Sequence, residues 1–259
     1  MQANVGDIVK NNKQQLEMQI LEIIDSQRIK IKFLKSGYET IVYKHNFYAG
    51  RVRDKFSGMN KDYRYGYIGN GNYKDENGNK SKSYSYWAHM IRRSCDLNFK
   101  SDSRNLAYAD VSVCDEWLNF ENFDKWFNEN YYECPFGGFM CLDKDILVKH
   151  NKVYSPETCC FVPNNINVLF LKQKYHKDKG IPFGSKLGKN ADGSIKYIVR
   201  TTEYRKEKNI GTYKTKEEAF FAYKQEKERY IKEVAELYKP YIPKNVYDAM
   251  MKYEVEEND

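Results

Sequence analysis

The chain has 259 residues, of which 41% are hydrophobic, and its 23 tyrosines and 14 phenylalanines supply much of that fraction. This is enough apolar material for one large domain or two to three small ones, and it excludes a chain that is disordered throughout. Lys and Arg total 43 against 36 Asp and Glu, and the formal charge of +7 moderately favours a polyanionic partner, because contacts with phosphates release counterions.

The N-terminal residues 1–56 predict a small, β-barrel-like domain. Residues 28–33 alternate basic and apolar side chains, which is typical of a half-buried strand. Ser36 and Gly37 supply a turn between two strands. Residues 57–85 are rich in Gly, Asn and Lys and lack periodicity, so we expect an exposed loop or a hairpin with a long tip.

Two helices are predicted in residues 86–141. Trp87, Met90 and Ile91 recur at helical spacing and indicate the first helix. The second helix is indicated by an aromatic stripe at intervals of three and four residues, which is typical of a buried helix face. The stripe consists of Trp117, Phe120, Phe123, Trp126 and Phe127.

Residues 142–171 predict a strand, a turn, a second strand and a helix. The first strand covers residues 142–147, the chain turns back at residues 151–154, and the helix covers residues 164–171. A ββα unit of this length is a compact frame for a metal site.

Residues 195–210 alternate and predict two further strands. A helix begins after Thr215, because Thr215 and Glu218 match a capping box, and it continues to Pro240. Residues 244–253 predict one more short helix before an acidic end. We therefore expect an α+β fold with several domains. The predicted parts are residues 1–56, 57–179, 180–239 and 240–259.

The third of these parts resembles a known family. Its order of motifs is Gly184-Ser185-Lys186, then Tyr197-Ile198-Val199-Arg200, then IGTYKTKEEAFFAY at residues 210–223. This order resembles the APETALA-type DNA-binding domain of plant ethylene-responsive factors, which also occurs fused to phage and mobile-element nucleases. In that family a three-stranded sheet lies in the major groove, while the helix supports the sheet from behind.

This resemblance implies a DNA-contacting sheet face. If Val199 and Ile210 point toward the helix, then alternate residues of both strands point away from it. These residues are Arg200, Thr202, Glu207 and Asn209. Three positions depart from the family, because Lys186 replaces an Arg, Tyr197 replaces a Trp and Asn209 replaces another aromatic residue. The expected DNA-contacting residues are Lys186, Tyr197, Arg200, Thr202 and Asn209.

Residues 86–171 carry a second resemblance. The motifs are Trp87-x-x-Met90, Val113-Cys114-Asp115-Glu116-Trp117, Leu142-Asp143-Lys144-Asp145 and Tyr154-Ser155-Pro156-Glu157-Thr158-Cys159. Their order resembles phage-encoded proteins related to HNH (His-Me finger) homing endonucleases. In active HNH nucleases a His on the first strand is the general base, and one Mg²⁺ is held by an acidic residue and by a helix Asn or His.

The resemblance places the candidate catalytic centre on the ββα unit. It implies that Asp143, with Asn164 or Asn167, would hold Mg²⁺. Lys144 stands where the catalytic His is expected, and a Lys of ordinary pKa is protonated at neutral pH and is a poor base. Three alternatives stay open: Lys144 is a tuned base or a phosphate clamp, His150 replaces the missing His, or the site is inactive. Asp143 and Asp145 alternate with Lys144 and would share one strand face; the alternative is a salt-bridged strand with no metal.

The cysteines and the apolar runs indicate in which compartment the protein lies and whether it holds a structural metal. No apolar run approaches the roughly 18 residues that a membrane helix needs, and the N-terminus shows no secretory signal, so we expect a cytoplasmic protein with no membrane partner. The six cysteines then stay reduced. Because no CxxC pair occurs, the spacing argues against a structural Zn²⁺.

The sequence thus predicts a sequence-specific protein that binds double-stranded DNA and resembles HNH homing endonucleases. Metal-dependent phosphodiester cleavage is the enzymatic form of this hypothesis. The alternative is a catalytically inactive phage regulator or a host-interaction protein on the same scaffold, with a protein partner if DNA binding fails. The sequence assigns no oligomeric state.

Overall fold

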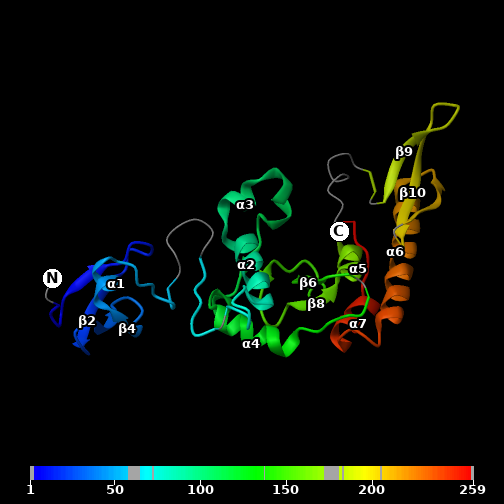
Figure 1. Cartoon of the computed structure of the whole chain (residues 1–259). Helices are drawn as coiled ribbons and strands as arrows, with labels where there is room; N and C mark the ends of the chain where they lie inside the picture. Colours follow the sequence, from blue (N-terminus) through cyan, green and yellow to red (C-terminus); the bar gives the residue numbers. More distant parts are fainter. Residues whose placement is uncertain are drawn as a thin grey trace. The chain divides into compact units, whose positions relative to one another are not determined.

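The computed structural model describes residues 3–57, 65–71, 73–136, 138–171, 181–182, 184–204 and 206–257, and the fold is α+β, as predicted (Figure 1). The chain divides into two compact units. The first comprises residues 1–131 and 150–159, and the second comprises residues 132–149 and 160–259. The predicted domain boundary between residues 179 and 180 lies outside the described residues.

The first unit begins with a four-stranded antiparallel sheet. Its strands, in spatial order, are β1 (Ile8–Lys10), β2 (Glu17–Ile23), β3 (Arg28–Phe33) and β4 (Glu39–Tyr43), followed by the short helix α1 (Lys44–Tyr48). The strand predicted over residues 28–33 is confirmed, and its apolar residues Ile29, Ile31 and Phe33 are buried. The basic residues between them lie on the opposite face.

The rest of the first unit is mainly helical. It contains α2 (Lys82–Cys95), α3 (Leu97–Ser101), η1 (Ser103–Tyr108), β5 (Ser112–Val113), η2 (Asp115–Leu118), α4 (Phe120–Asn130) and β7 (Val153–Tyr154). The predicted helix around Trp87 is α2. The aromatic stripe, however, is divided, because Asn119 has extended backbone and its side chain accepts a hydrogen bond from the N–H of Glu121. Asn119 therefore caps α4, and Trp117 lies in the preceding 3₁₀ turn.

The second unit contains the ββα arrangement, but its first strand ends at Asp143, so residues 144–147 of the predicted strand lie in the turn that follows it. The strands β6 (Met140–Asp143) and β8 (Cys160–Pro163) pair antiparallel and are followed by α5 (Asn164–Asn167) and η3 (Val168–Phe170). Residues 151–154, where the chain was predicted to turn back, include the short strand β7, which pairs with β5. All four residues of β8 are buried, so this strand lacks the alternation by which a half-buried strand is recognised.

A second sheet and two helices complete this unit. The strands β9 (Ser185–Lys189), β10 (Ile195–Glu203) and β11 (Lys206–Tyr213) form an antiparallel sheet with β10 in the centre. The helices are α6 (Lys216–Tyr238) and α7 (Lys244–Met251). The predicted capping box is confirmed, since the Thr215 hydroxyl accepts from the N–H of Glu218 while the Glu218 carboxylate accepts from the N–H of Thr215.

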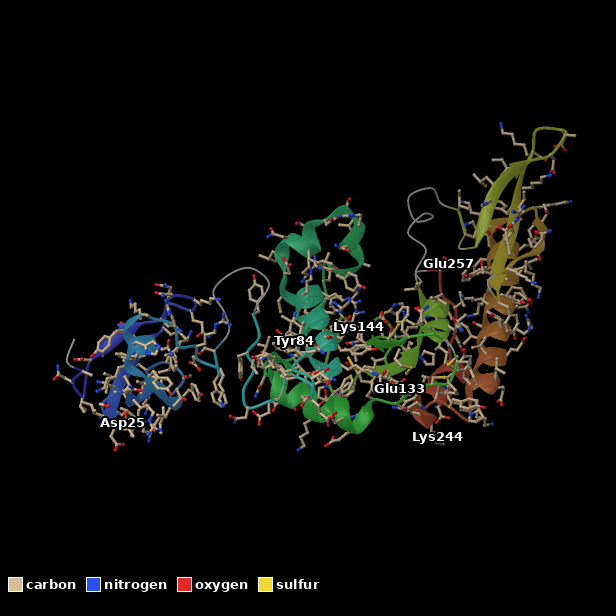
Figure 2. All side chains as sticks on the ribbon, in the orientation of Figure 1. Asp25, Tyr84, Glu133, Lys144, Lys244 and Glu257 are labelled. Atoms are coloured by element: carbon tan, nitrogen blue, oxygen red, sulfur yellow. The ribbon has the colours of Figure 1, made fainter. Side chains whose placement is uncertain are left out.

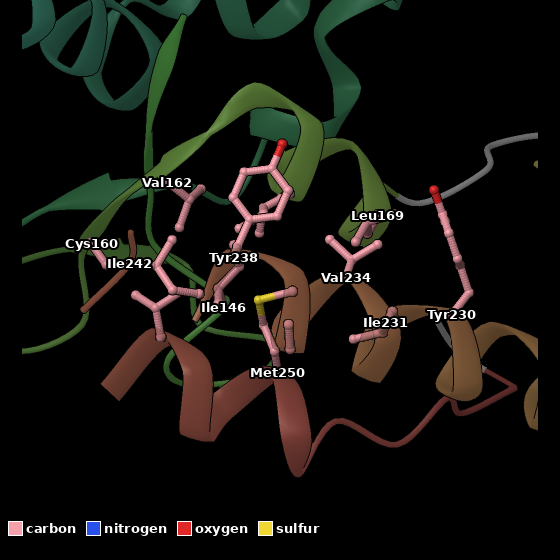
Figure 3. Close-up of a cluster of buried hydrophobic side chains, with 13 residues drawn as sticks. Ile146, Cys160, Val162, Leu169, Tyr230, Ile231, Val234, Tyr238, Ile242 and Met250 are labelled. Carbon is pink, nitrogen blue, oxygen red and sulfur yellow. The ribbon is translucent and has the colours of Figure 1, made fainter. Parts of the chain in front are cut away.

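The helix α6 contributes to two hydrophobic cores. Near its start, α6 lies against the sheet (Figure 1), where Ala219 and Tyr223 pack with Val199. Gly184 permits this close approach: its φ is 73°, and a Cβ there would lie 2.0 Å from the Tyr223 ring. Further along, α6 packs on the ββα arrangement and α7 (Figure 3). The second core includes Ile146, Val162, Leu169, Tyr230, Ile231, Val234, Tyr238 and Met250.

The last described residues, 252–257, form a segment outside the helices and strands that we call the C-terminal strap. The Tyr253 ring lies edge-on to Phe170, with centroids 4.9 Å apart, and the ammonium of Lys149 stands 4.8 Å from the Tyr253 centroid. Val255 is buried in the core of the sheet, and its carbonyl accepts a hydrogen bond of 2.9 Å from Lys224. The strap therefore contacts both cores of the second unit.

Candidate nucleic-acid interface

The sheet β9–β10–β11 has one face packed on α6 and one face turned away from it, which we call the outer face. Along β10, Val199 and Thr201 are buried on the helix side, whereas Arg200 and Thr202 are exposed on the outer face. This alternation follows from the period of two in a strand. It confirms the predicted orientation of Val199, Arg200 and Thr202 relative to the helix.

A β-bulge decides which residues of β11 share this face. Val199 pairs with Gly211, but the next residue, Arg200, pairs with Asn209, so Ile210 is the extra residue. A shift of one residue moves every following side chain to the other face of a sheet. Because of the bulge, Asn209 and Glu207 stand opposite Arg200 and Thr202 on the outer face.

The predicted contact residues on the other strands divide between the two faces. Lys186 on β9 is exposed and pairs with Ile198, which places it on the outer face. Tyr197 does not lie there. It pairs with Leu187 and Tyr213 and packs against the core around Val199, so it is a core residue of the sheet and not part of its outer face.

Lys196 also belongs to the outer face, although sequence reasoning did not select it. Lys196 lies two positions before Ile198 on β10, on the same side of the strand as Arg200. The period of two, counted back from Arg200, would have identified it. With Lys196 and Lys186, the outer face has a basic side chain on each of two neighbouring strands.

The outer face also carries one ion pair. Nη1 of Arg200 donates to a carboxylate oxygen of Glu207 at 2.8 Å, and the two side chains are 41% and 59% exposed. Lys208, by contrast, contacts Glu203 and Glu226 on the helix side. The bulge thus separates the charges of β11, with Glu207 outside and Lys208 against α6.

The ββα arrangement holds the candidate catalytic residues. Oδ1 of Asp143 accepts hydrogen bonds of 2.8 Å from the backbone N–H groups of Asp145 and Ile146. These bonds close the turn that follows β6. Burial, followed by the nearby Asp145 carboxylate, raises the pKa of Asp143 to about 6, although the two backbone bonds oppose this shift.

The other candidates of this site are engaged with different partners. Lys144, which is labelled in Figure 2, has a side chain that is 11% exposed, and its ammonium lies 3.2 Å from a carboxylate oxygen of Asp145. The Asn164 side-chain oxygen accepts from the thiol of Cys141 at 3.7 Å. Within the described part of the chain, no hydrogen bond joins Asp143 to Asn164 or Asn167. His150 belongs to the other compact unit.

These contacts bear on whether the site suits Mg²⁺. Mg²⁺ prefers one or two carboxylates together with water and substrate phosphates. Here one oxygen of Asp143 is used by two backbone N–H groups, and Lys144 neutralises Asp145. The residues present therefore fit a turn closed by Asp143 and a Lys–Asp pair better than the implied Mg²⁺ site. Across the described ranges, no group of three or more His, Cys, Asp or Glu side chains is placed to hold a metal ion.

Comparisons with known proteins identify no family for this chain. No protein-family model matches the chain, and searches of curated proteins and of solved structures give no match either. In the residues that the structure describes, no helix is both long enough and apolar enough to cross a membrane.

Proposed function

We propose that this protein binds double-stranded DNA and that the outer face of the sheet β9–β10–β11 enters the major groove. The observation that carries the proposal is the register of β10 and β11, which gathers Arg200, Thr202 and Asn209 on one exposed face. Guanidinium, hydroxyl and amide groups are those that read base edges. Lys186 on the neighbouring strand adds a cation for the phosphate backbone.

The dimensions of the sheet also suit the groove. A two- or three-stranded ribbon fits the major groove of B-DNA. Arg200 and Thr202 are two positions apart, or about 6.6 Å along a strand, which is close to two base-pair steps of ~3.4 Å. Neighbouring side chains of β10 would thus face base pairs two steps apart. The resemblance of residues 180–239 to the APETALA-type domain agrees with this mode of binding.

The ββα arrangement serves in this proposal as a folded support for α6. The Lys144–Asp145 pair and the turn closed by Asp143 favour a binding protein whose HNH-like centre does not cut DNA. A cytoplasmic location belongs to the same proposal, because a reducing compartment agrees with six free thiols.

The experiment is a titration of labelled random duplex DNA between ~50 and ~200 mM salt. We compare the wild type with Lys186→Glu and with a matched charge reversal on the exposed side of α6, Lys232→Glu. Lys186→Glu is expected to weaken binding by about tenfold or more and to reduce the salt dependence, because it removes a phosphate contact. Lys232→Glu should bind nearly as the wild type does.

Two results would contradict the proposal. The outer face would be excluded if both reversals weakened binding equally, and DNA as the partner would be excluded if the wild type did not bind at low salt. A parallel incubation with Mg²⁺ tests the enzymatic alternative. Cutting by the wild type that disappears in Asp143→Ala would assign metal-dependent cleavage to the ββα arrangement.

A further inference from the structure

We propose that Glu207 orients the guanidinium of Arg200 for a guanine base, so that Glu207 is a positioning residue that sets the base preference of the outer face. This inference rests on the proposed DNA binding and adds the class of target, a guanine-containing step in the major groove. Glu207 is negatively charged, whereas the side chains that bind phosphates are positively charged.

The first support is the placement of the two residues. Arg200 pairs directly with Asn209, and Glu207 pairs with Thr202, so Arg200 and Glu207 are diagonal neighbours on adjacent strands. Long side chains at such positions reach each other across a sheet. They do so here only because the bulge at Ile210 moves Glu207 to the outer face.

The second support is the way in which the guanidinium is used. Nη1 donates to Glu207, and among the described residues no hydrogen bond is made by Nε or Nη2 of Arg200. These two groups form one edge of the planar guanidinium. Two parallel N–H groups on one edge match the N7 and O6 acceptors of guanine in the major groove.

The third support is electrostatic. A carboxylate on a face that meets DNA is repelled by the phosphates, so Glu207 lowers the affinity for DNA of any sequence. An exposed ion pair of this kind adds little to the stability of a fold. The position of Glu207 is therefore explained better by the orientation of Arg200 than by affinity or by stability, since discrimination often depends on groups that disfavour the wrong partner.

The experiment measures base preference and general affinity separately. Preferred sites are selected from a randomised duplex library by the wild type, Glu207→Gln, Arg200→Lys and Glu217→Gln. Glu217 is an exposed residue at the start of α6, so its variant removes the same charge from outside the outer face. The selected wild-type site is then tested with 7-deazaguanine, which lacks the N7 acceptor, at each guanine in turn.

We expect the wild type to prefer guanine at one position and to lose about 5- to 100-fold in affinity when that guanine is replaced by 7-deazaguanine. Glu207→Gln should bind random DNA more tightly than the wild type, because a negative charge is lost, but its preference for guanine should fall by a similar factor. Arg200→Lys should also lose the preference, because an ammonium cannot make the two parallel bonds. Glu217→Gln should keep it.

The outcomes separate the two proposals. A wild type that does not bind duplex DNA overturns both of them. A wild type that binds and selects, while Glu207→Gln keeps the full preference for guanine, overturns the role of Glu207 alone. Equal thermal unfolding of the four proteins is the check that a loss of preference does not arise from a loss of fold.

Discussion

At the scale of single residues, Asp143 shows why a sequence motif alone does not define a catalytic centre. The run Leu142-Asp143-Lys144-Asp145 has the carboxylates that a metal site needs. In the structure, the same Asp143 closes a backbone turn, and Lys144 pairs with Asp145. An Asp after a strand is typical both of a turn and of a metal site. The same carboxylate oxygens that accept hydrogen bonds in a turn can bind a metal.

The raised pKa of Asp143 predicts a stability that depends on pH. The ionised carboxylate is disfavoured in the folded state, so its pKa is about 6 when folded and near the ordinary 3.8 when unfolded. The contribution of this group is then most favourable below pH ~4 and is lost as the pH rises through about 6. Asp143→Asn keeps an oxygen for the turn and removes the charge.

We therefore expect Asp143→Asn to be more stable than the wild type above pH ~7, by at most about 3 kcal/mol, and equally stable below pH ~4. Urea denaturation of both proteins across this range measures the difference. A constant difference at all pH values would contradict the raised pKa. A wild type that gains stability from Mg²⁺ at neutral pH, when Asp143→Asn does not, would instead favour a cation at this carboxylate.

At the scale of elements, the capping box of α6 is a local signal that the tertiary structure preserves. The Thr215 hydroxyl and the Glu218 carboxylate satisfy backbone N–H groups that a helix start would otherwise leave unpaired. Thr215→Ala is expected to lower the free energy of unfolding by about 1 kcal/mol. Urea denaturation measures this change. The exposed neighbour Lys216 gives the control, since Lys216→Ala should change stability by less than ~0.5 kcal/mol.

The elements that could be predicted from the sequence are those with a local or periodic signal. β3 alternates, α6 has its capping box, and both were predicted with their starts correctly placed. β8 was predicted only as a second strand without bounds, because a fully buried strand has no alternation. Its partner β6 was predicted at residues 142–147 and not at 140–143, because its position is fixed by long-range pairing. The division of the aromatic stripe depends on Asn119, whose preference for a cap outweighed the spacing of its neighbours.

The outer face was only partly predictable for a similar reason. Alternation along β10 correctly placed Arg200 and Thr202. Tyr197, which the family resemblance implied, follows the opposite phase of the same alternation and lies in the core. Asn209 and Glu207 were also placed correctly, by alternation from Ile210, but the bulge itself has no signature in a single sequence, because it follows from how two strands pair.

At the scale of the whole molecule, the C-terminal strap links the two cores of the second unit. Tyr253 contacts Phe170 and Lys149, while Val255 is buried against the sheet. A chain that ends at Lys252 is expected to show faster hydrogen exchange at the backbone amides of β10, because the core of the sheet loses a buried side chain. A chain that ends at Glu257 keeps these contacts and is the control. Unchanged protection of β10 in the shorter chain would show that the strap is not needed for the sheet.

The helix α6 limits which segments of this chain can be exchanged with those of other proteins. Its first half completes the sheet, and its second half completes the core of the ββα arrangement. In a chimaera in which this chain is joined to another protein after Tyr238, the residues Tyr230, Ile231 and Val234 would lack their buried partners. A crossover before Thr215 would leave the sheet without its supporting helix. We therefore expect that substitutions on the outer face can transfer DNA specificity to another chain with this fold. Transfer of the sheet alone is not expected to do so.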